Sequence, residues 1–163
     1  MRKLILIVGV VVAAAVLTAC GGQAAERYKE IAGLASPDGR EIALSEVVTA
    51  NEYTLLDFWA SWCGPCMAEL PHLKAAYDEF HGRGFEIYGV SYDDDGAAWR
   101  EAIDGGGMNW VHVSALRGWE CPTQALYGVN AIPRNYLIDR RGNIVAMNLR
   151  GEALGRELAG LLK

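Results

Sequence analysis

The sequence predicts one α/β domain, and its apolar pattern is the main reason. Two dense apolar runs, 53–59 and 85–92, are typical of strands that are buried on both faces of a sheet. The segment between them, 64–80, has helical spacing that places Leu73, Tyr77 and Phe80 on one side. Because strand, helix and strand follow one another, we expect a parallel pair of strands covered by a helix.

The first nineteen residues have the features of an export signal. Arg2 and Lys3 precede an apolar run, 4–16, that is short for a membrane-spanning helix. The run ends in Leu17-Thr18-Ala19-Cys20, which resembles the lipobox of bacterial lipoproteins, where cleavage precedes a cysteine that is then lipidated. An uncleaved anchor and an ordinary cleaved signal remain alternatives. All three place the remaining chain outside the cytoplasm, so we expect a lipid-anchored protein of the bacterial cell envelope, facing the periplasm if the cell is Gram-negative.

Length and charge limit the organisation of the chain. Removing residues 1–19 from the 163 residues leaves 144, which suits one domain with a full core. Residues 20–30 contain few apolar side chains and predict a tether, so the domain is expected over 31–163. The net charge of −5 offers no basic stripe for phosphates, and this argues against a nucleic-acid partner.

The remaining elements are predicted from turn signals and periodicity. An N-terminal β-hairpin is expected, with strands 31–35 and 41–44 around the turn Ser36-Pro37-Asp38-Gly39. Pro71 should kink the 64–80 helix. After the second buried strand we expect a helix at 97–103, a strand at 110–113, a helix at 122–127 begun by Pro122, a hairpin of strands 134–138 and 143–148, and an amphipathic helix at 152–162.

Two cysteines follow the first buried strand at the start of the predicted helix. Cys63 would lie near unpaired backbone N–H groups and the positive end of the helix dipole, which stabilise a thiolate. Cys66 would lie one turn inward and be shielded. The pair could therefore attack a disulfide through Cys63 and resolve the mixed disulfide through Cys66.

Two other uses of this cysteine pair are less favoured. A zinc site needs two further ligands. Apart from Cys20, the remaining cysteine is Cys121, and it is scattered along the sequence together with the three histidines, His72, His81 and His112. A purely structural disulfide across so short a loop would remove little unfolded-state entropy. Redox chemistry is the preferred interpretation, and no metal or other cofactor is expected.

The motifs resemble those of a known family. The stretch Trp59-Ala60-Ser61-Trp62-Cys63-Gly64-Pro65-Cys66 is similar to the thioredoxin active site. Ala131-Ile132-Pro133 and the following residues 136–142 resemble the family's cis-proline loop and hairpin. Residues 31–162 are similar to the membrane-anchored TlpA/ResA-like thiol-disulfide oxidoreductases, which overlap with the AhpC/TSA group. The resemblance implies a thioredoxin fold, a central mixed sheet flanked by helices, with residues 94–119 as an inserted helix and strand.

The resemblance also implies roles for individual residues. Pro133 should be cis and face the disulfide, so that the backbone of Ile132 can pair with an incoming peptide. A proline in a surface turn is the alternative. Arg134 departs from the family pattern, which often has a small hydroxyl residue there, and it adds a positive charge. The substrate-binding residues implied in this way are Trp62, Gly64, Pro65, Ile132, Pro133 and Arg134.

Two acidic residues complete the predicted catalytic set. Asp57 matches the buried acid of thioredoxin, and a carboxyl in an apolar strand needs either a partner or a raised pKa. It could exchange a proton with Cys66, or it could be a hydrogen-bonded structural aspartate. Glu69 resembles the glutamate of the ResA-like CxxCxxE pattern, although an ordinary solvated glutamate fits its position nearly as well.

Four other residues have both a functional and a structural interpretation. Cys121 is predicted at the N-cap of a helix, where a lowered pKa is conceivable, but a free, packed cysteine is favoured. Trp99, Trp110 and Trp119 could form an aromatic ligand site, but packing of the inserted elements explains them better.

The function expected from these observations is reduction of protein disulfides. Gly64-Pro65 between the cysteines resembles thioredoxin, which is strongly reducing at about −270 mV. The expected partners are proteins with disulfides or dithiols and a membrane-bound electron donor. The alternatives are a copper(I) module using Cys63, Cys66 and Met67, an AhpC/TSA-type peroxidase, for which Ala60 replaces the needed hydroxyl residue, and a non-catalytic binding domain.

Overall fold

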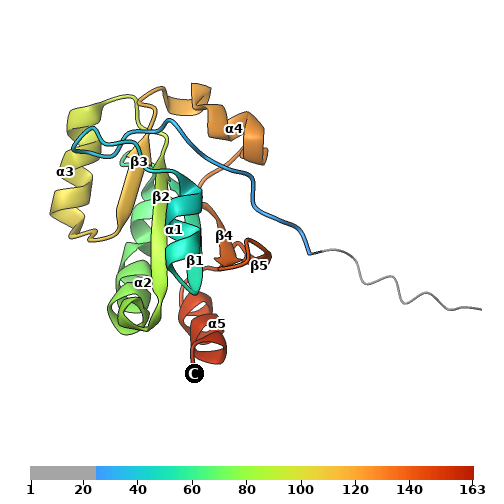
Figure 1. Ribbon diagram of the computed structural model, residues 1–163. Coiled ribbons are helices and arrows are strands. Elements are labelled where there is room, and N and C mark those ends of the chain that lie inside the picture. Colours follow the sequence, from blue (N-terminus) through green and yellow to red (C-terminus); the bar gives the residue numbers. More distant parts are fainter. Residues whose placement is uncertain (1–24) are drawn as a thin grey trace, which may run out of the picture.

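A computed structural model describes residues 25–163 as a five-stranded mixed sheet with helices packed on both faces (Figure 1). The strand order is β3-β2-β1-β4-β5. β1 runs parallel to β2 and antiparallel to β4. The strands are β1 (Tyr53–Trp59), β2 (Phe85–Ser91), β3 (Val111–Ser114), β4 (Arg134–Asp139) and β5 (Ile144–Met147).

Five α-helices and two short 3₁₀ turns connect these strands. They are α1 (Leu44–Ala50), α2 (Gly64–Phe80), α3 (Gly96–Gly106), α4 (Pro122–Tyr127), α5 (Ala153–Leu161), η1 (His81–Arg83) and η2 (Gly118–Glu120). α2 continues through Pro71, and the kink expected there stays a prediction. Within residues 25–163, no helix combines the length and apolar character that crossing a membrane requires. The predicted signal and Cys20 lie outside the described residues.

From β1 onward, the predicted strands and helices are confirmed to within a few residues, but the N-terminal hairpin was only partly right. The turn is present, since the Ser36 N–H donates to the Arg40 carbonyl at 2.9 Å. Only a single bridge joins Ala35 to Glu41, and Ala35 also bridges to Ser114 at the end of β3. The chain therefore crosses the edge of the sheet instead of pairing along a second strand.

α1 was not predicted from the sequence. It begins at Leu44, the last residue of the expected second hairpin strand, and it buries Leu44, Val47 and Val48. The Glu46 carboxylate accepts a hydrogen bond from the N–H of Ala43 at 3.1 Å, which stabilises the first turn. With only seven residues, this helix depends on its packing against the sheet.

β1 lies at the centre of the sheet and is buried along almost its whole length. Leu55, Leu56 and Phe58 are fully buried. On one face, the Phe58 ring packs against Tyr127 at a centroid distance of 5.4 Å. The side chain of Asp57 points to the opposite face, towards α2. The end of this rigid strand positions the loop that carries the cysteines.

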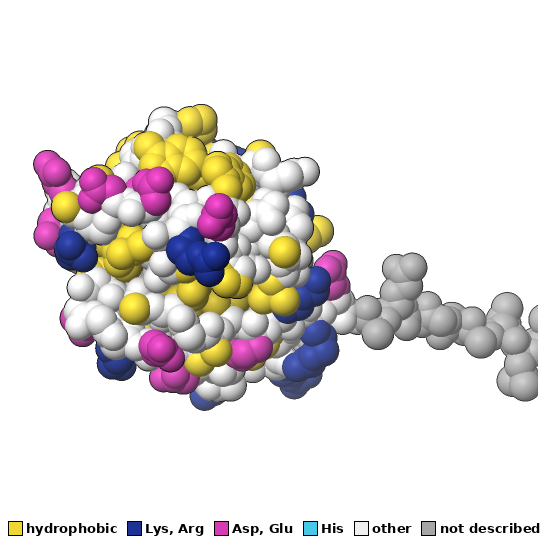
Figure 2. All heavy atoms as spheres, turned by 90° about the horizontal axis from the view of Figure 1, so that it is seen from above, with side chains coloured by type: hydrophobic (Ala, Val, Ile, Leu, Met, Phe, Trp, Pro, Cys, Tyr) yellow, Lys and Arg dark blue, Asp and Glu magenta, His cyan; other side chains and the backbone are white. Residues whose placement is uncertain are grey.

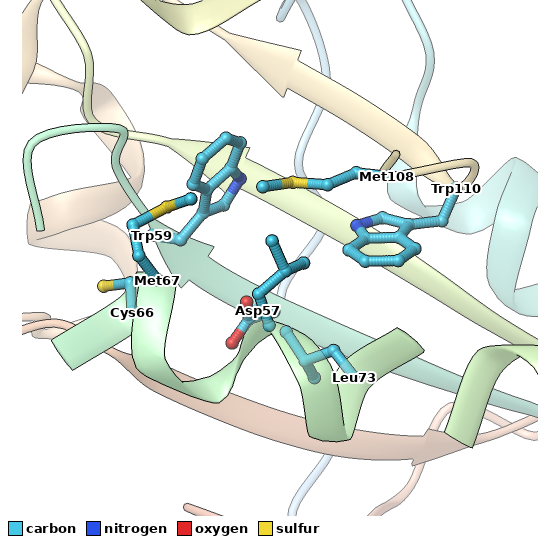
Figure 3. A pocket seen from close by; sticks show the side chains of 8 residues that line it. Asp57, Trp59, Cys66, Met67, Leu73, Met108 and Trp110 are labelled. Carbon is cyan, nitrogen blue, oxygen red and sulfur yellow. The ribbon is translucent and has the colours of Figure 1, made fainter. Parts of the chain in front are cut away.

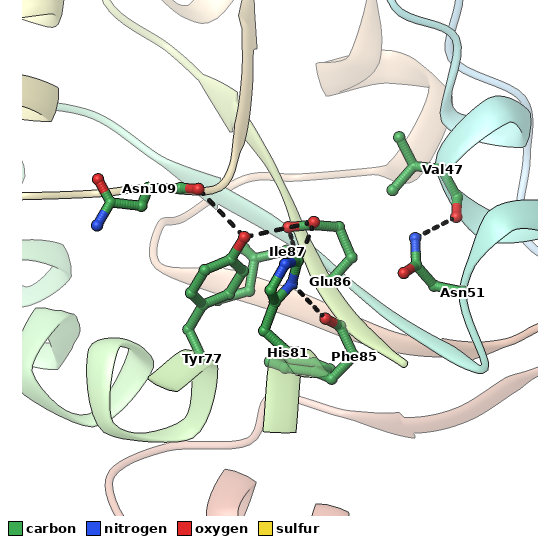
Figure 4. Close-up of polar contacts among 8 residues, drawn as sticks. All are labelled: Val47, Asn51, Tyr77, His81, Phe85, Glu86, Ile87 and Asn109. Atoms are coloured by element: carbon green, nitrogen blue, oxygen red, sulfur yellow. Dashed lines mark hydrogen bonds and ion pairs between the residues drawn. The ribbon is translucent and has the colours of Figure 1, made fainter. Parts of the chain in front are cut away.

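A polar cluster fixes the far end of α2 to β2 (Figure 4). The Tyr77 hydroxyl donates to the Asn109 carbonyl at 3.1 Å and lies 3.4 Å from the Glu86 carboxylate. His81 Nδ1 is 3.5 Å from the same carboxylate. Burial raises the pKa of Glu86, while its hydrogen bond from the Ile87 N–H and the nearby His81 oppose this effect. These contacts set the position of α2 over the sheet.

Candidate active site

The two cysteines form a disulfide at the beginning of α2. Their Cα atoms are 5.2 Å apart. Cys63 occupies the N-cap position, and its sulfur accepts a hydrogen bond from the N–H of Cys66 at 3.2 Å. The Cys66 N–H, which has no partner within the helix, and the helix dipole therefore act on Cys63, as expected from the sequence. This arrangement stabilises a thiolate after reduction.

Cys66 differs from Cys63 mainly because it lines a small cavity beneath the start of α2. The two residues are 5 % and 6 % exposed, so exposed surface alone does not show the expected shielding of Cys66 in the oxidised protein. Cys66, however, lines this small cavity together with Asp57. Gly64 and Pro65 between the cysteines are exposed, and so is Trp62, at 53 %. The nucleophilic role of Cys63 and the resolving role of Cys66 stay predictions.

A small, partly open cavity is lined by both Cys66 and the predicted acid, Asp57 (Figure 3). It has a volume of about 10 Å³, near the minimum that holds one water molecule. Its walls come from β1, α2 and the segment before β3. The lining residues are Asp57, Trp59, Cys66, Met67, Leu70, Leu73, Met108 and Trp110. Asp57 is the acidic residue among them, and it shares this space with the inner cysteine.

The pKa of Asp57 is raised to about 7, mainly because burial removes water from its charged form. The Arg150 guanidinium and the Asn135 amide act in the opposite direction and lower this pKa, while Glu69 raises it. Asn135 faces Asp57 across the β1–β4 pairing. A carboxyl with a pKa near neutrality can both accept and release a proton under physiological conditions.

Arg150 is a site residue that the sequence analysis missed. Its guanidinium donates to the backbone oxygen of Pro133 and, at 3.0 Å, to that of Leu149. It therefore connects the proline loop to the electrostatic environment of Asp57. The only sequence signal is an arginine just after the last predicted strand, which does not distinguish it from a surface residue.

The predicted cis-proline is confirmed, since the Ile132–Pro133 bond is cis and directly precedes β4. Ile132, Pro133 and Arg134 are each half-buried. The Arg134 side chain is held by Tyr136, whose hydroxyl accepts from Nε at 2.6 Å and whose ring lies 5.2 Å from the guanidinium carbon. The positive charge at Arg134 is therefore fixed in place beside the loop.

Glu69 is not an ordinary solvated helix residue. It is half-buried, and its carboxylate accepts a hydrogen bond from the N–H of Gly151 at 2.7 Å. Because Gly151 follows Arg150, Glu69 ties α2 to the same segment that approaches Asp57. Its catalytic role stays a prediction, although its charge does raise the pKa of Asp57.

A second buried acid, Asp93, holds the loop before the cysteines, and the sequence analysis did not identify it. Asp93 is 1 % exposed. Its carboxylate accepts hydrogen bonds from the N–H of Ser61 at 3.1 Å, from the Ser61 hydroxyl at 2.5 Å and from the Ser91 hydroxyl at 2.6 Å. All three partners are donors, so the site requires a group that only accepts.

The remaining candidates have structural positions. Cys121 is a free, buried cysteine at the N-cap of α4, with its sulfur 3.1 Å from the Thr123 hydroxyl. Trp99 and Trp110 are buried in the core, and Trp119, 44 % exposed, packs at the rim with its ring 5.2 Å from that of Tyr92, which agrees with the expected core and rim packing. Among residues 25–163, no group of three or more His, Cys, Asp or Glu side chains could hold a metal ion.

Comparison with known proteins identifies the family. The model of the AhpC/TSA family matches residues 23–147. The chain belongs to the AhpC/TSA family. Over 126 residues it is 29 % identical to the thiol-disulfide oxidoreductase ResA of Bacillus thuringiensis (strain Al Hakam), covering 77 % of this chain and 69 % of that protein.

Solved structures agree with this family assignment. The thioredoxin domain of a thiol-disulfide oxidoreductase from Bacteroides vulgatus superposes with a TM-score of 0.78 at 29 % identity, covering 85 % of this chain and 97 % of that one. A thiol-disulfide oxidoreductase from Bacteroides fragilis gives 0.77 at 32 % identity, covering 84 % and 100 %. The chain therefore has a thioredoxin fold, and this AhpC/TSA member is a thiol-disulfide oxidoreductase of the TlpA/ResA type.

The raised pKa of Asp57 predicts how stability depends on pH. Below about pH 4, Asp57 is protonated in both the folded and the unfolded protein. Between pH 4 and 7 only the unfolded chain ionises, so the wild type loses stability as the pH rises. A pKa near 7 instead of 3.8 corresponds to a loss on the order of 4 kcal/mol. Asp57→Asn should remove this loss, as measured by urea unfolding of the oxidised protein at several pH values. Parallel profiles for the two proteins would contradict the assignment.

The charge of Arg150 predicts a second shift. Arg150→Met should raise the pKa of Asp57 above its present value of about 7, because the nearby positive charge lowers it. Arg150→Lys should keep most of the effect. The carbon-13 NMR titration of the Asp57 carboxyl measures the pKa directly. Arg156→Met, at an exposed position on α5, is the control and should leave the pKa unchanged. An equal titration in Arg150→Met and the wild type would exclude this coupling.

Proposed function

We propose that this oxidoreductase is a lipid-anchored reductase of protein disulfides outside the cytoplasm. The observation that carries the proposal is the cysteine pair Cys63-Gly64-Pro65-Cys66 at the N-terminus of α2, backed by a buried acid whose pKa is near 7. The Gly-Pro pair resembles the strongly reducing thioredoxin site, which supports reduction as the direction. The similarity to ResA proteins supports protein thiols and disulfides as the substrates.

The first step uses the reduced form of the pair. The Cys63 thiolate attacks one sulfur of the substrate disulfide, the substrate S–S bond breaks, and one substrate sulfur leaves as a thiolate. The helix N-terminus stabilises the attacking thiolate. Cys63 is then joined to the substrate in a mixed disulfide, with exposed Trp62, Gly64 and Pro65 and the Ile132–Pro133 segment forming the proposed binding surface.

The second step releases the substrate and oxidises the enzyme. Cys66 gives its proton to Asp57, and the resulting thiolate attacks the sulfur of Cys63. The mixed disulfide breaks, the second substrate sulfur leaves as a thiolate, and the Cys63–Cys66 disulfide forms. Two electrons have passed to the substrate. An external dithiol donor, which we propose to be bound to the membrane, must return them before the next cycle.

The direction and the roles of the two cysteines can be tested together. The full chain in detergent should accelerate the reduction of insulin by dithiothreitol, and Cys63→Ser should abolish the acceleration, because the attacking sulfur is lost. Cys66→Ser should instead accumulate a mixed disulfide on Cys63, which mass spectrometry detects. The assigned roles would be contradicted if the Cys63→Ser protein were active, or if it formed the mixed disulfide with the substrate through Cys66. Equilibration with glutathione then measures the potential, and a value like that of an oxidant would exclude the reductase direction.

The location forms a separate prediction because residues 1–24 lie outside the described part of the chain. We expect the wild type to incorporate a radiolabelled fatty acid and to fractionate with membranes. Cys20→Ala should lose the label, because the acyl-accepting sulfur is gone. Cys121→Ala is the matched control, since its sulfur is buried inside the domain. Labelling that persists in Cys20→Ala would exclude lipidation at this residue.

A further inference from the structure

An exposed apolar surface continues from the active-site loop onto η2. Trp62, Leu116 and Trp119 are 53 %, 38 % and 44 % exposed, and we call these three residues the tryptophan surface. The rings of Trp62 and Trp119 lie 6.3 Å apart. Figure 2 shows a group of hydrophobic side chains on this face of the molecule, with acidic side chains beside it. Large exposed aromatic groups that contact one another are typical of binding surfaces.

Two glycines lie at the edge of the tryptophan surface. A Cβ added to Gly118 would lie 3.9 Å from Asp94, and one added to Gly96 would lie 3.1 Å from the Leu116 side chain. Leu116 therefore lies beside the start of α3, and Gly118, the residue before Trp119, lies beside Asp94. Leu116 has a φ of 51°, a left-handed conformation that costs energy for a branched side chain. The fold thus holds a large apolar group at the surface despite this cost.

Hydrogen bonds join the tryptophan surface rigidly to the loop of Cys63. The Trp62 indole N–H donates to the Tyr92 carbonyl at 3.3 Å. Asp93 binds Ser61 through its carboxylate, and its backbone carbonyl accepts from the N–H of Gly118 at 3.3 Å. One residue therefore connects the segment before Cys63 to the segment before Trp119. The surface is preorganised relative to the reactive sulfur.

The charges beside the surface have an excess of negative sign. Asp94, Asp95 and Glu120 are exposed at its border, and the exposed cations there are Arg117 and Arg100, whose guanidinium lies beside Gly96 and Leu116. Arg117 lies 3.8 Å from Glu120, and Arg100 is the second cation, so the three acids exceed the cations by one negative charge. The Asp95 carboxylate caps α3, accepting from the N–H of Ala97 at 2.7 Å. The border therefore attracts a positively charged partner.

We infer that the tryptophan surface is a docking site for the substrate, and that it selects a protein segment with a bulky apolar side chain and a basic side chain next to its disulfide. The inference rests on the proposed function, because the partner must present a disulfide to Cys63. It adds the chemical class of the substrate. Burial of an aromatic or aliphatic side chain against Trp62 and Trp119 supplies the affinity, and the acids at the border supply orientation and a faster encounter.

The substrate side can be tested with matched peptides. Each peptide contains one disulfide, and the flanking residues are Leu and Lys, Leu and Glu, or Ser and Lys. The fully reduced full chain in detergent should react with the Leu–Lys peptide on the order of five- to tenfold faster than with either of the others. The difference between Lys and Glu should shrink as the salt concentration rises to about 0.5 M, because exposed charges are screened.

The protein side can be tested with three variants. Trp119→Ala should lower the rate with the Leu–Lys peptide by much more than the rate with neutral hydroxyethyl disulfide. The combined change Asp94→Asn with Glu120→Gln should remove the preference for Lys over Glu, and it leaves the α3 cap at Asp95 intact. Leu161→Ala, an exposed apolar position on α5, should leave all peptide rates unchanged.

The outcomes separate the two levels of the proposal. Equal rates with the three peptides, or equal losses in Trp119→Ala and Leu161→Ala, would overturn the docking site while leaving disulfide reduction intact. Absence of any reaction with insulin, with the three peptides and with hydroxyethyl disulfide would overturn the proposed function and the docking site with it. Circular dichroism of each variant confirms that a lost preference does not result from unfolding.

Discussion

The structure of the site depends on the burial of β1 at the centre of the sheet. This strand pairs with β2 on one side and with β4 on the other, so its position is fixed in both directions. It carries Asp57 in the middle, and it ends directly before the loop to Cys63. β4 begins at the residue after the cis-proline. The pairing of β1 with β4 therefore sets the relative positions of the buried acid, the cysteines and the proline loop.

Desolvation at this central position gives the site a carboxyl whose pKa lies near neutrality. An aspartate on an exposed strand would be ionised at neutral pH and would make a poor proton donor. Burial at the wall of a small cavity raises the pKa of Asp57 to about 7, and Arg150 keeps it from rising further. The same arginine binds the backbone before β4. One side chain therefore links the pKa of Asp57 to the cis-proline loop.

A second buried aspartate, Asp93, has different surroundings. Asp93 is surrounded by hydroxyl and N–H donors, whereas Asp57 faces a mostly apolar cavity. The first environment stabilises an acceptor that fixes the active-site loop, and the second favours a group that exchanges a proton. The two aspartates, one within β1 and one just after β2, are therefore suited to different tasks: Asp93 positions the loop, and Asp57 is the proposed proton acceptor.

The sequence by itself determined the family, the order of strands and helices after residue 50, the cysteine pair and the cis-proline. These features depend on local patterns: apolar runs, a helix start at Gly64-Pro65 and two motifs about seventy residues apart. It did not determine the single bridge in place of the N-terminal hairpin, because the pairing of Ala35 with Ser114 joins residues far apart in the chain. Nor did it identify Arg150, Asn135 or Asp93, whose types are common at surfaces. Only the tertiary structure decided their roles, because a pKa and a hydrogen bond depend on which groups meet in space and how much water remains around them.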